Sequence, residues 1–381
     1  MKYRFLGKIG FSRVKGIARV AVLIAALCVI GVGTAGATDV NVSQLLTFNL
    51  DVSSMGWVSP ITVNANTSYI DTPLSLIIPS LWEVRWQVPF EGSSPSPMIT
   101  ISGTGSFEVV SGGSVSNTGT DVAISSTNTP ITISGGRISA QGDNAINTVS
   151  DVTVSGGTVI AGGTNHIAIN ATGASSAVSV TGGIIEATGS SGSAIKATGA
   201  SSTVSVSSGT IKATNTNGKA IDKVAGSVPT INGSANIFTS GSDSTLDSLV
   251  TSGLLFKGNS GTVYGTSVVT LNESLSIPSG GTLTVPSGAK LRIPLGVTLT
   301  VPRTSPPTTL YVDTTGIVDG NGSVTGSGTY AGSGTIMGTP ASDYSPGTSI
   351  GGGGSGGGCS AGFGAIPLLL AAALAFRKRR A

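Results

Sequence analysis

Val154-Ser155-Gly156-Gly157 recurs as Val180-Thr181-Gly182-Gly183 and as Val206-Ser207-Ser208-Gly209, and this repeat decides the fold. The three copies follow one another at a constant spacing along the chain. A second marker keeps the same period in Ala168-Ile169-Asn170, Ala194-Ile195-Lys196 and Ala220-Ile221-Asp222. Two independent markers with one period indicate a repeat protein in which every copy forms the same structural unit.

One repeat contains three short segments in which apolar and polar residues alternate. They are Val178-Ser179-Val180, Ile185-Glu186-Ala187 and Ile195-Lys196-Ala197. Alternation with a period of two is typical of β-strands, and the Gly and Ser residues between the segments favour tight bends. The repeat therefore predicts an all-β fold, a single-stranded parallel β-helix solenoid in which one repeat makes one coil. We expect the right-handed sense that is usual for this architecture.

The period also predicts which residues are neighbours, because residues 26 apart should lie on adjacent rungs about 4.8 Å apart. The predicted apolar column runs through Val154, Val180 and Val206. On the outside, Glu186 should lie beside Lys212 and Lys196 beside Asp222. Exposed ion pairs contribute only ~0–1 kcal/mol each, so we expect these two pairs to set the register of the strands more than their stability.

A second repeat, with a period of eight residues, occupies residues 271–337. Its pattern is Leu-x-[Ile/Val]-Pro-x-Gly, with Leu275, Leu283, Leu291 and Leu299 as the leading residues. Proline cannot donate a hydrogen bond to a β-ladder, so we expect Pro278 and its equivalents at corners. Three such octads come close to the length of one coil in the first array, which predicts that the same solenoid continues with tighter coils.

The remaining body segments complete the predicted domain organisation. Residues 38–98 lack the repeat and contain all three tryptophans, Trp57, Trp82 and Trp86, which predicts an N-terminal cap over an otherwise unpaired solenoid end. The first array of coils covers 99–240. Residues 241–270 connect the two arrays, and a short lateral helix or a loop is expected from Leu246 to Phe256. Residues 338–358 form a linker rich in Gly and Ser.

Both ends of the chain have the composition of targeting segments, each with an expected helix. Residues 1–37 combine a basic stretch, an apolar run and Ala35-Gly36-Ala37, which predicts a signal peptide cleaved after Ala37. Residues 359–381 contain Cys359, an apolar segment and four final basic residues before Ala381. The alternatives are lipidation at Cys28 or a retained anchor helix at the N-terminus, and a permanent tail anchor at the C-terminus.

The stretch GGGCSAGFGAIPLLL at 356–370, followed by the basic residues RKRR, resembles the Synergist-type C-terminal sorting domains of Gram-negative envelopes. This resemblance covers only the tail. It implies passage through the export machinery, cleavage near Cys359 by a membrane sorting protease, and attachment of a lipid or another group to Cys359. The protein would then be anchored in the envelope membrane, at the cell surface, through its tail or lipid.

The coils ITISGGRISA (131–140), VTVSGGTVIA (152–161) and VSVTGGIIEATG (178–189) resemble those of parallel β-helix carbohydrate-binding and adhesin-like repeat proteins. That resemblance implies contact with glycans or with host or neighbouring cell surfaces. Members of the group that bind calcium use repeated Asp residues near the Ala-Ile marker. Here those places hold Asn144, Asn147, Asn170 and Lys196, which is a departure from the calcium-binding pattern.

Charge, cysteine content and the single histidine limit the chemistry of the body. Ten of the 20 basic residues lie in the two ends, whereas all 17 acidic residues lie between Asp39 and Asp343. The acidic body argues against nucleic-acid binding. Cys28 and Cys359 both lie in the ends, so the body has no disulfide and no thiolate metal site. No nucleophile-elbow motif accompanies His166, the only histidine.

Carboxylates are the remaining candidates for a site. Asp121, Asp143 and Asp151 are candidate oxygen ligands for calcium, although the same residues can form ordinary Asx turns. We see no catalytic constellation and no cofactor fingerprint, which favours a non-enzymatic envelope protein that serves as an adhesin, a stalk or a surface-layer component. Two alternatives stay open. One is a glycan-binding module, and the other is a polysaccharide lyase or hydrolase, which needs carboxylates that converge on one face.

Overall fold

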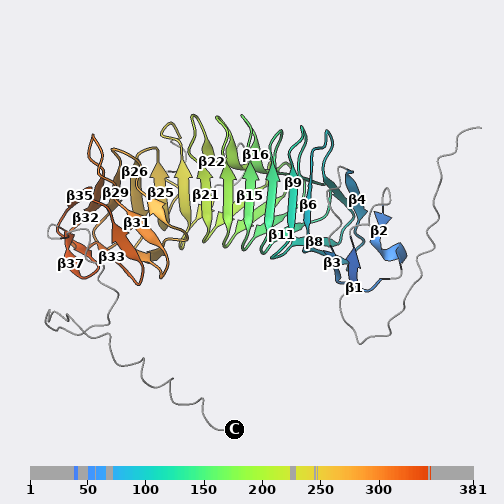
Figure 1. The fold of residues 1–381 in the computed structure, drawn as a ribbon, viewed down its shortest axis with the longest axis horizontal. Coiled ribbons are helices and arrows are strands. Elements are labelled where there is room, and N and C mark those ends of the chain that lie inside the picture. Colours follow the sequence, from blue (N-terminus) through green and yellow to red (C-terminus); the bar gives the residue numbers. More distant parts are fainter. Residues whose placement is uncertain are drawn as a thin grey trace, which may run out of the picture. The chain divides into compact units, whose positions relative to one another are not determined.

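The computed structural model describes residues 38–41, 50–55, 57–65, 72–223, 229–243, 246, 248–341 and 344 (Figure 1). Within these ranges the regular elements are β-strands, apart from the short 3-10 turn η1 (Val52–Met55). The strands stack in parallel to form a β-helix, which confirms the predicted fold class. The signal peptide with its cleavage site at Ala37, most of the linker and the tail with Cys359 lie outside the described residues.

Successive coils of the first array stack through three parallel sheets, A, B and C. In Figure 1 the strands of sheet C follow one another in sequence order. Sheet A consists of β1 (Thr38–Asn41), β3 (Ile61–Ala65), β5 (Glu83–Trp86), β8 (Ser106–Val109), β11 (Ile131–Ile133), β14 (Val152–Val154), β17 (Ala177–Val180), β20 (Thr203–Val206) and β23 (Thr230–Ile231). Sheet B consists of β2 (Leu50–Asp51), β4 (Leu74–Ile77), β7 (Ile99–Ser102), β10 (Ile124–Ser126), β13 (Ile146–Thr148), β16 (Ile167–Ala171), β19 (Ser193–Ala197) and β22 (Lys219–Lys223). In the first array, sheet C consists of β6 (Pro89–Gly92), β9 (Ser114–Asn117), β12 (Arg137–Ala140), β15 (Thr158–Ala161), β18 (Ile184–Ala187), β21 (Thr210–Ala213), β24 (Asn236–Thr239) and β25 (Gly253–Lys257).

The register places residues 26 apart on adjacent rungs in the coils that carry the repeat. Val154 is the partner of Val180, and Val180 is the partner of Val206. All three side chains are fully buried in one continuous core. Earlier coils contain fewer residues. Ile124 and its register partner Ile146 are closer in sequence than Val154 and its partner Val180. The difference is absorbed at the corners, so the apolar columns continue although the sequence period changes.

The Gly-Gly marker is explained by the corner between sheets A and C. Each marker valine ends a strand of sheet A, and the chain must then turn sharply into sheet C. The last glycine of the marker has a positive φ, 75° at Gly183 and 87° at Gly209. Side chains other than glycine rarely adopt this left-handed conformation. The residues of the marker therefore form one recurring corner of the coil, between sheets A and C.

Residues 38–98, predicted to be a separate cap, already belong to the solenoid. The described residues of this segment contribute strands to all three sheets, from β1 in sheet A to β6 in sheet C. Trp86 is fully buried in the first core, and Trp57 and Trp82 pack against it. The prediction missed these coils because they keep the alternation of apolar and polar residues without the Gly-Gly marker.

The connecting segment closes the first core and then returns to strand structure. Leu246 and Val250 are buried in the first core, and Val250 forms a bridge to Ile231. The last part of the segment from Leu246 to Phe256, which was expected to form a lateral helix or a loop, belongs to strand β25 (Gly253–Lys257), parallel to β24. The expectation was wrong here because the run Leu254-Leu255-Phe256 is apolar on both faces of a strand.

A β-hairpin reverses the chain direction at the start of the second array. β25 pairs antiparallel with β26 (Ser260–Tyr264). Sheet C then continues with β29 (Thr282–Val285), β32 (Thr309–Val312) and β35 (Thr329–Ala331), each parallel to its predecessor. Two further sheets complete the second array. Sheet D consists of β27 (Val268–Thr270), β30 (Lys290–Ile293), β33 (Ile317–Gly320), β36 (Thr335–Ile336) and the antiparallel β37 (Thr339–Pro340), and sheet E of β28 (Leu275–Ser276), β31 (Thr298–Thr300) and β34 (Ser323–Thr325).

The second array has its own core on the opposite face of sheet C. Ile237 and Leu255 belong to the first core, whereas Phe238 and Phe256, the next residues along β24 and β25, belong to the second. The prediction that one solenoid simply continues is therefore wrong. The strand direction of sheet C reverses at the hairpin, and the face that points into the core reverses as well. The two reversals cancel in their effect on handedness, so the two arrays wind with the same hand.

The octad repeat supplies one strand to each of three sheets. Leu275 on β28 is the partner of Leu299 on β31, so three octads make one coil, as predicted. The prolines stand at the corners. The carbonyl of Pro278 accepts a hydrogen bond of 2.8 Å from the N–H of Gly281, and Gly280 has a φ of 67°. This is the arrangement of a type II turn, which requires a positive φ at its third residue.

Candidate functional site

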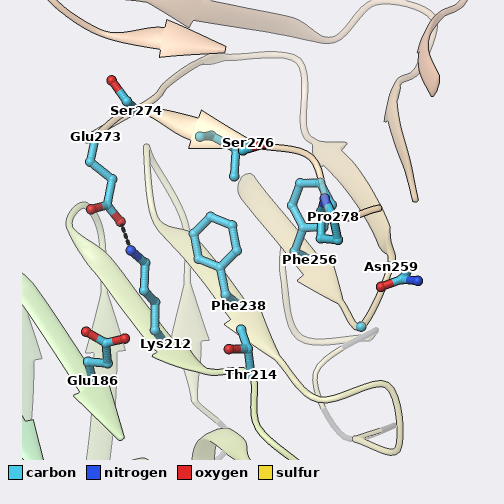
Figure 2. A pocket seen from close by; sticks show the side chains of 12 residues that line it. Glu186, Lys212, Thr214, Phe238, Phe256, Asn259, Glu273, Ser274, Ser276 and Pro278 are labelled. Carbon is cyan, nitrogen blue, oxygen red and sulfur yellow. Dashed lines mark ion pairs between the residues drawn. The ribbon is translucent and has the colours of Figure 1, made fainter. Parts of the chain in front are cut away.

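A pocket of about 530 Å³ lies where the second array begins on the outer face of sheet C (Figure 2). We call it the junction pocket. One wall is the outer face of β18, β21, β24 and β25, and the facing wall is the segment that contains β28. Its lining residues are Glu186, Lys212, Thr214, Phe238, Phe256, Gly258, Asn259, Glu273, Ser274, Leu275, Ser276 and Pro278.

The sheet wall of the pocket is a single column of outward side chains. Glu186 is the register partner of Lys212, Lys212 of Phe238, and Phe238 of Phe256. Adjacent members therefore stand about 4.8 Å apart along the stack. The repeat thus places a carboxylate, an ammonium group and two aromatic rings in one row.

The two rings form an aromatic pair at the end of this row. Their centroids are 5.7 Å apart and their planes differ by 11°. Both rings are buried, Phe256 with 1% and Phe238 with 8% of its surface exposed. The Nζ atom of Lys212 lies 5.7 Å from the centroid of the Phe238 ring, within the range in which a cation is attracted by an aromatic face.

Gly261 makes room for this pair. It is the antiparallel partner of Phe256 on β26, and a methyl group at its Cα would overlap the Phe256 ring. We expect Gly261→Ala to displace the ring and to lower the free energy of unfolding by about 2 kcal/mol, the usual cost of overpacking a core. Urea unfolding followed by circular dichroism measures this loss.

The matched control for Gly261→Ala is Thr262→Ala, one residue further along β26 on its other face. A half-exposed position of this kind normally changes stability by less than about 0.5 kcal/mol. Equal stability of the two variants would mean that Phe256 does not occupy the space above Gly261.

The polar groups of the pocket come from both walls. The Lys212 ammonium forms an ion pair with Glu273, which precedes β28 (Figure 2). Glu186 lies beside Lys212 in the ladder, as predicted, but Lys212 pairs with Glu273 instead. No ion pair or hydrogen bond joins the Glu186 carboxylate to any described residue. It is a free acceptor at the edge of the pocket.

The second predicted charge pair lies on sheet B, away from the pocket lining. Lys196 and Asp222 are register partners, and their Nζ and Oδ2 atoms are 3.6 Å apart. Lys219 also donates a hydrogen bond of 2.8 Å to Asp222. This hydrogen bond raises the pKa of Lys219 above its usual value, against the opposing effect of burial. The three residues form a surface charge cluster that links the last two coils of sheet B.

The three calcium candidates do not come together. Asp121 lies three residues before Ile124, and Asp143 lies three residues before Ile146, its register partner in sheet B. Asp151 lies elsewhere, at the corner that leads into sheet A. Each carboxylate accepts a backbone hydrogen bond, from Val122, Asn144 and Ala177 respectively. Across the described ranges, no three His, Cys, Asp or Glu side chains form a group that could hold a metal ion.

The polar residues near the Ala-Ile marker bond to one another. The Oδ1 atom of Asn147 accepts hydrogen bonds of 3.0 Å from the side-chain amides of Asn144 and Asn170. His166 lies at the corner before β16 with its ring against Gly163. Its Nδ1 atom is buried and has no hydrogen-bond partner among the described residues. This corner therefore shows an asparagine ladder and an isolated histidine.

Sequence reasoning missed the aromatic residues of the junction pocket, and it used the tryptophans to predict the N-terminal cap. The tryptophans pack in or against the first core, and none of them lines the junction pocket. A signal for the missed residues was present. Ile237-Phe238 and Leu254-Leu255-Phe256 interrupt the alternation, which places apolar side chains on both faces of β24 and β25.

Within the described ranges, the structure contains no helix that is long and apolar enough to cross a membrane. Comparisons with protein-family models, with curated proteins and with solved structures found no match. The chain is therefore classified by its fold, a parallel β-helix solenoid in two arrays that share sheet C.

Proposed function

We propose that the protein is a non-enzymatic envelope protein whose solenoid is displayed at the cell surface as an adhesin-like or structural element. The observation that carries this proposal is the continuous stack of coils. Sheet C runs through both arrays, from β6 to β35. Such a stack holds its two ends at a fixed separation, because each coil packs directly on its neighbours.

The way in which the stack is stabilised suits an exposed location. Its coils are held by buried aliphatic columns and by backbone ladders, and residues 38–350 contain no cysteine. On β14, β17 and β20 of sheet A the outward residues include the short hydroxyl side chains Thr153, Ser179 and Ser205, which form a ladder of register partners. A surface of this kind is soluble and offers many hydrogen-bonding groups to a partner cell or matrix.

The display proposal depends on the two ends, and Cys359 is its test. We expect the protein on intact cells to be accessible to added protease, and the mature chain to lack residues 1–37. Cys359→Ala should change either the mass of the mature chain or its retention by the membrane. Fractionation and intact-mass spectrometry measure both properties.

Cys28→Ala is the matched control, because Cys28 lies within the predicted signal peptide and should be absent from the mature chain. This variant should give the same mature mass and the same retention as the unmodified protein. A cytoplasmic chain that keeps both ends would overturn the display proposal. So would a Cys359→Ala variant that is unchanged in both mass and retention.

A further inference from the structure

We infer that the junction pocket is a binding site for a neutral pyranose unit of a glycan. The inference does not depend on surface display, because it rests on the side chains that line the pocket. It adds to the solenoid a defined site for one sugar and its neighbours. The volume of about 530 Å³ lies within the range of small-molecule sites in proteins.

The apolar part of the pocket matches one face of a sugar ring. Phe238, Phe256 and Pro278 lie together at one end of the pocket (Figure 2). An aromatic ring has a negative face, which attracts positively polarised hydrogen atoms such as those on the C–H face of a pyranose. Both rings are buried, but Phe238 is the less deeply buried of the two, with 8% exposure against 1% for Phe256, so its ring is the aromatic surface that a sugar in the pocket would contact.

The polar part of the pocket matches the hydroxyl groups around the ring. Glu186 offers a carboxylate that no described residue engages, and hydrogen bonds to a charged acceptor are the stronger kind. Ser276 on the facing wall and Asn259 in the turn between β25 and β26 contribute further polar groups (Figure 2). The side-chain amide of Asn259 donates a hydrogen bond of 3.3 Å to the carbonyl of Ser279. A ligand that has both a C–H face and several hydroxyl groups satisfies both parts at once, whereas a purely apolar ligand would leave Glu186 without a partner.

The charge of the pocket selects against acidic sugars. Its lining contains two carboxylates, Glu186 and Glu273, and one ammonium group, which is already paired with Glu273. A uronic acid would place a third carboxylate beside Glu186, and like charges at short distance repel. Neutral glycans should therefore bind more tightly than polyuronates of the same length.

Isothermal titration of the full-length chain tests this site with four tetrasaccharides: cellotetraose, maltotetraose, tetra-N-acetylchitotetraose and tetragalacturonate. We expect at least one of the three neutral probes to bind, and tetragalacturonate to bind at least tenfold more weakly than that probe. Phe238→Leu, which keeps an apolar side chain but removes the ring, should weaken binding at least tenfold. Glu186→Gln keeps the shape of the side chain and should weaken binding about threefold to tenfold.

Two control variants lie on the same sheet, outside the pocket. Tyr311→Leu removes an exposed aromatic ring from β32, and Glu91→Gln neutralises an exposed carboxylate on β6. Both should bind the neutral probe as the unmodified protein does. The inference would be overturned if no neutral probe bound, if tetragalacturonate bound best, or if the control variants lost as much affinity as the pocket variants.

A thermal melt of each variant separates loss of binding from loss of folding, and Glu186→Gln keeps the test decisive if Phe238→Leu does not fold. The same samples also report on the proposed function. If the unmodified protein released reducing or unsaturated sugars, and Glu186→Gln did not, the sugar site would be supported. The non-enzymatic role would then fall, independently of where the protein is located.

Discussion

Val180→Asp is expected to unfold the central coils of the first array. Val180 is fully buried between its register partners Val154 and Val206. An aspartate there would have to place its carboxyl group among aliphatic side chains without a partner, which costs about 4 kcal/mol or more. Because each coil packs on the next, the defect should spread to neighbouring coils. Thermal unfolding followed by circular dichroism should show a strongly lowered melting temperature.

Ser179→Asp is the control for Val180→Asp, because Ser179 occupies the adjacent outward position on β17, between Thr153 and Ser205. The same charge at this position should change the free energy of unfolding by less than about 0.5 kcal/mol. If the two variants melted at the same temperature, Val180 would not lie in the interior of the stack.

Gly199→Ala is expected to produce the second large effect, through backbone contacts between coils. A methyl group at Gly199 would overlap the carbonyl oxygen of Gly173, the equivalent residue of the preceding coil. A methyl group at Gly173 would likewise overlap the carbonyl oxygen of Val149. Backbone atoms cannot move aside as a flexible side chain does. The coils would have to separate locally, at a cost of about 3 kcal/mol. Urea unfolding should show this loss as a lower midpoint.

The control for this variant is Gly241→Ala in the connecting segment. A methyl group there would meet only the Cα atom of Gly258, at 3.8 Å, an ordinary contact distance. Its effect on the unfolding midpoint should be small. Equal losses for Gly199→Ala and Gly241→Ala would contradict the close approach of successive coils at the corner between sheets B and A.

The sequence predicted the architecture because the coil repeats both its strands and its corners. The alternation of residues such as Val178, Ser179 and Val180 gives the inward and outward faces, and the marker glycines give the turn into sheet C. These signals are local, and they recur in each coil that carries the repeat. The coils within residues 38–98 were not predicted because their corners use other residues, although apolar and polar residues alternate in their strands in the same way.

The junction pocket was harder to predict because it depends on a contact between distant segments. The period of the first repeat places Glu186 beside Lys212, but it does not show that Glu273 approaches from the second array. That approach follows from the hairpin between β25 and β26, which moves the core to the other face of sheet C. The octad period gives the length of the new coils without giving the face on which they stack.

Pyrene fluorescence measures most directly whether residues 26 apart are vertical neighbours. Ser179 and Ser205, which are register partners on the outer face of sheet A, would be changed to cysteine and labelled in a chain in which alanine replaces Cys28 and Cys359. Two pyrene groups on adjacent rungs should stack and emit as an excimer. A chain labelled at positions 179 and 186, which lie on different sheets, should emit only as monomer. Excimer emission from the 179/186 pair, with none from the 179/205 pair, would contradict the stacked coils.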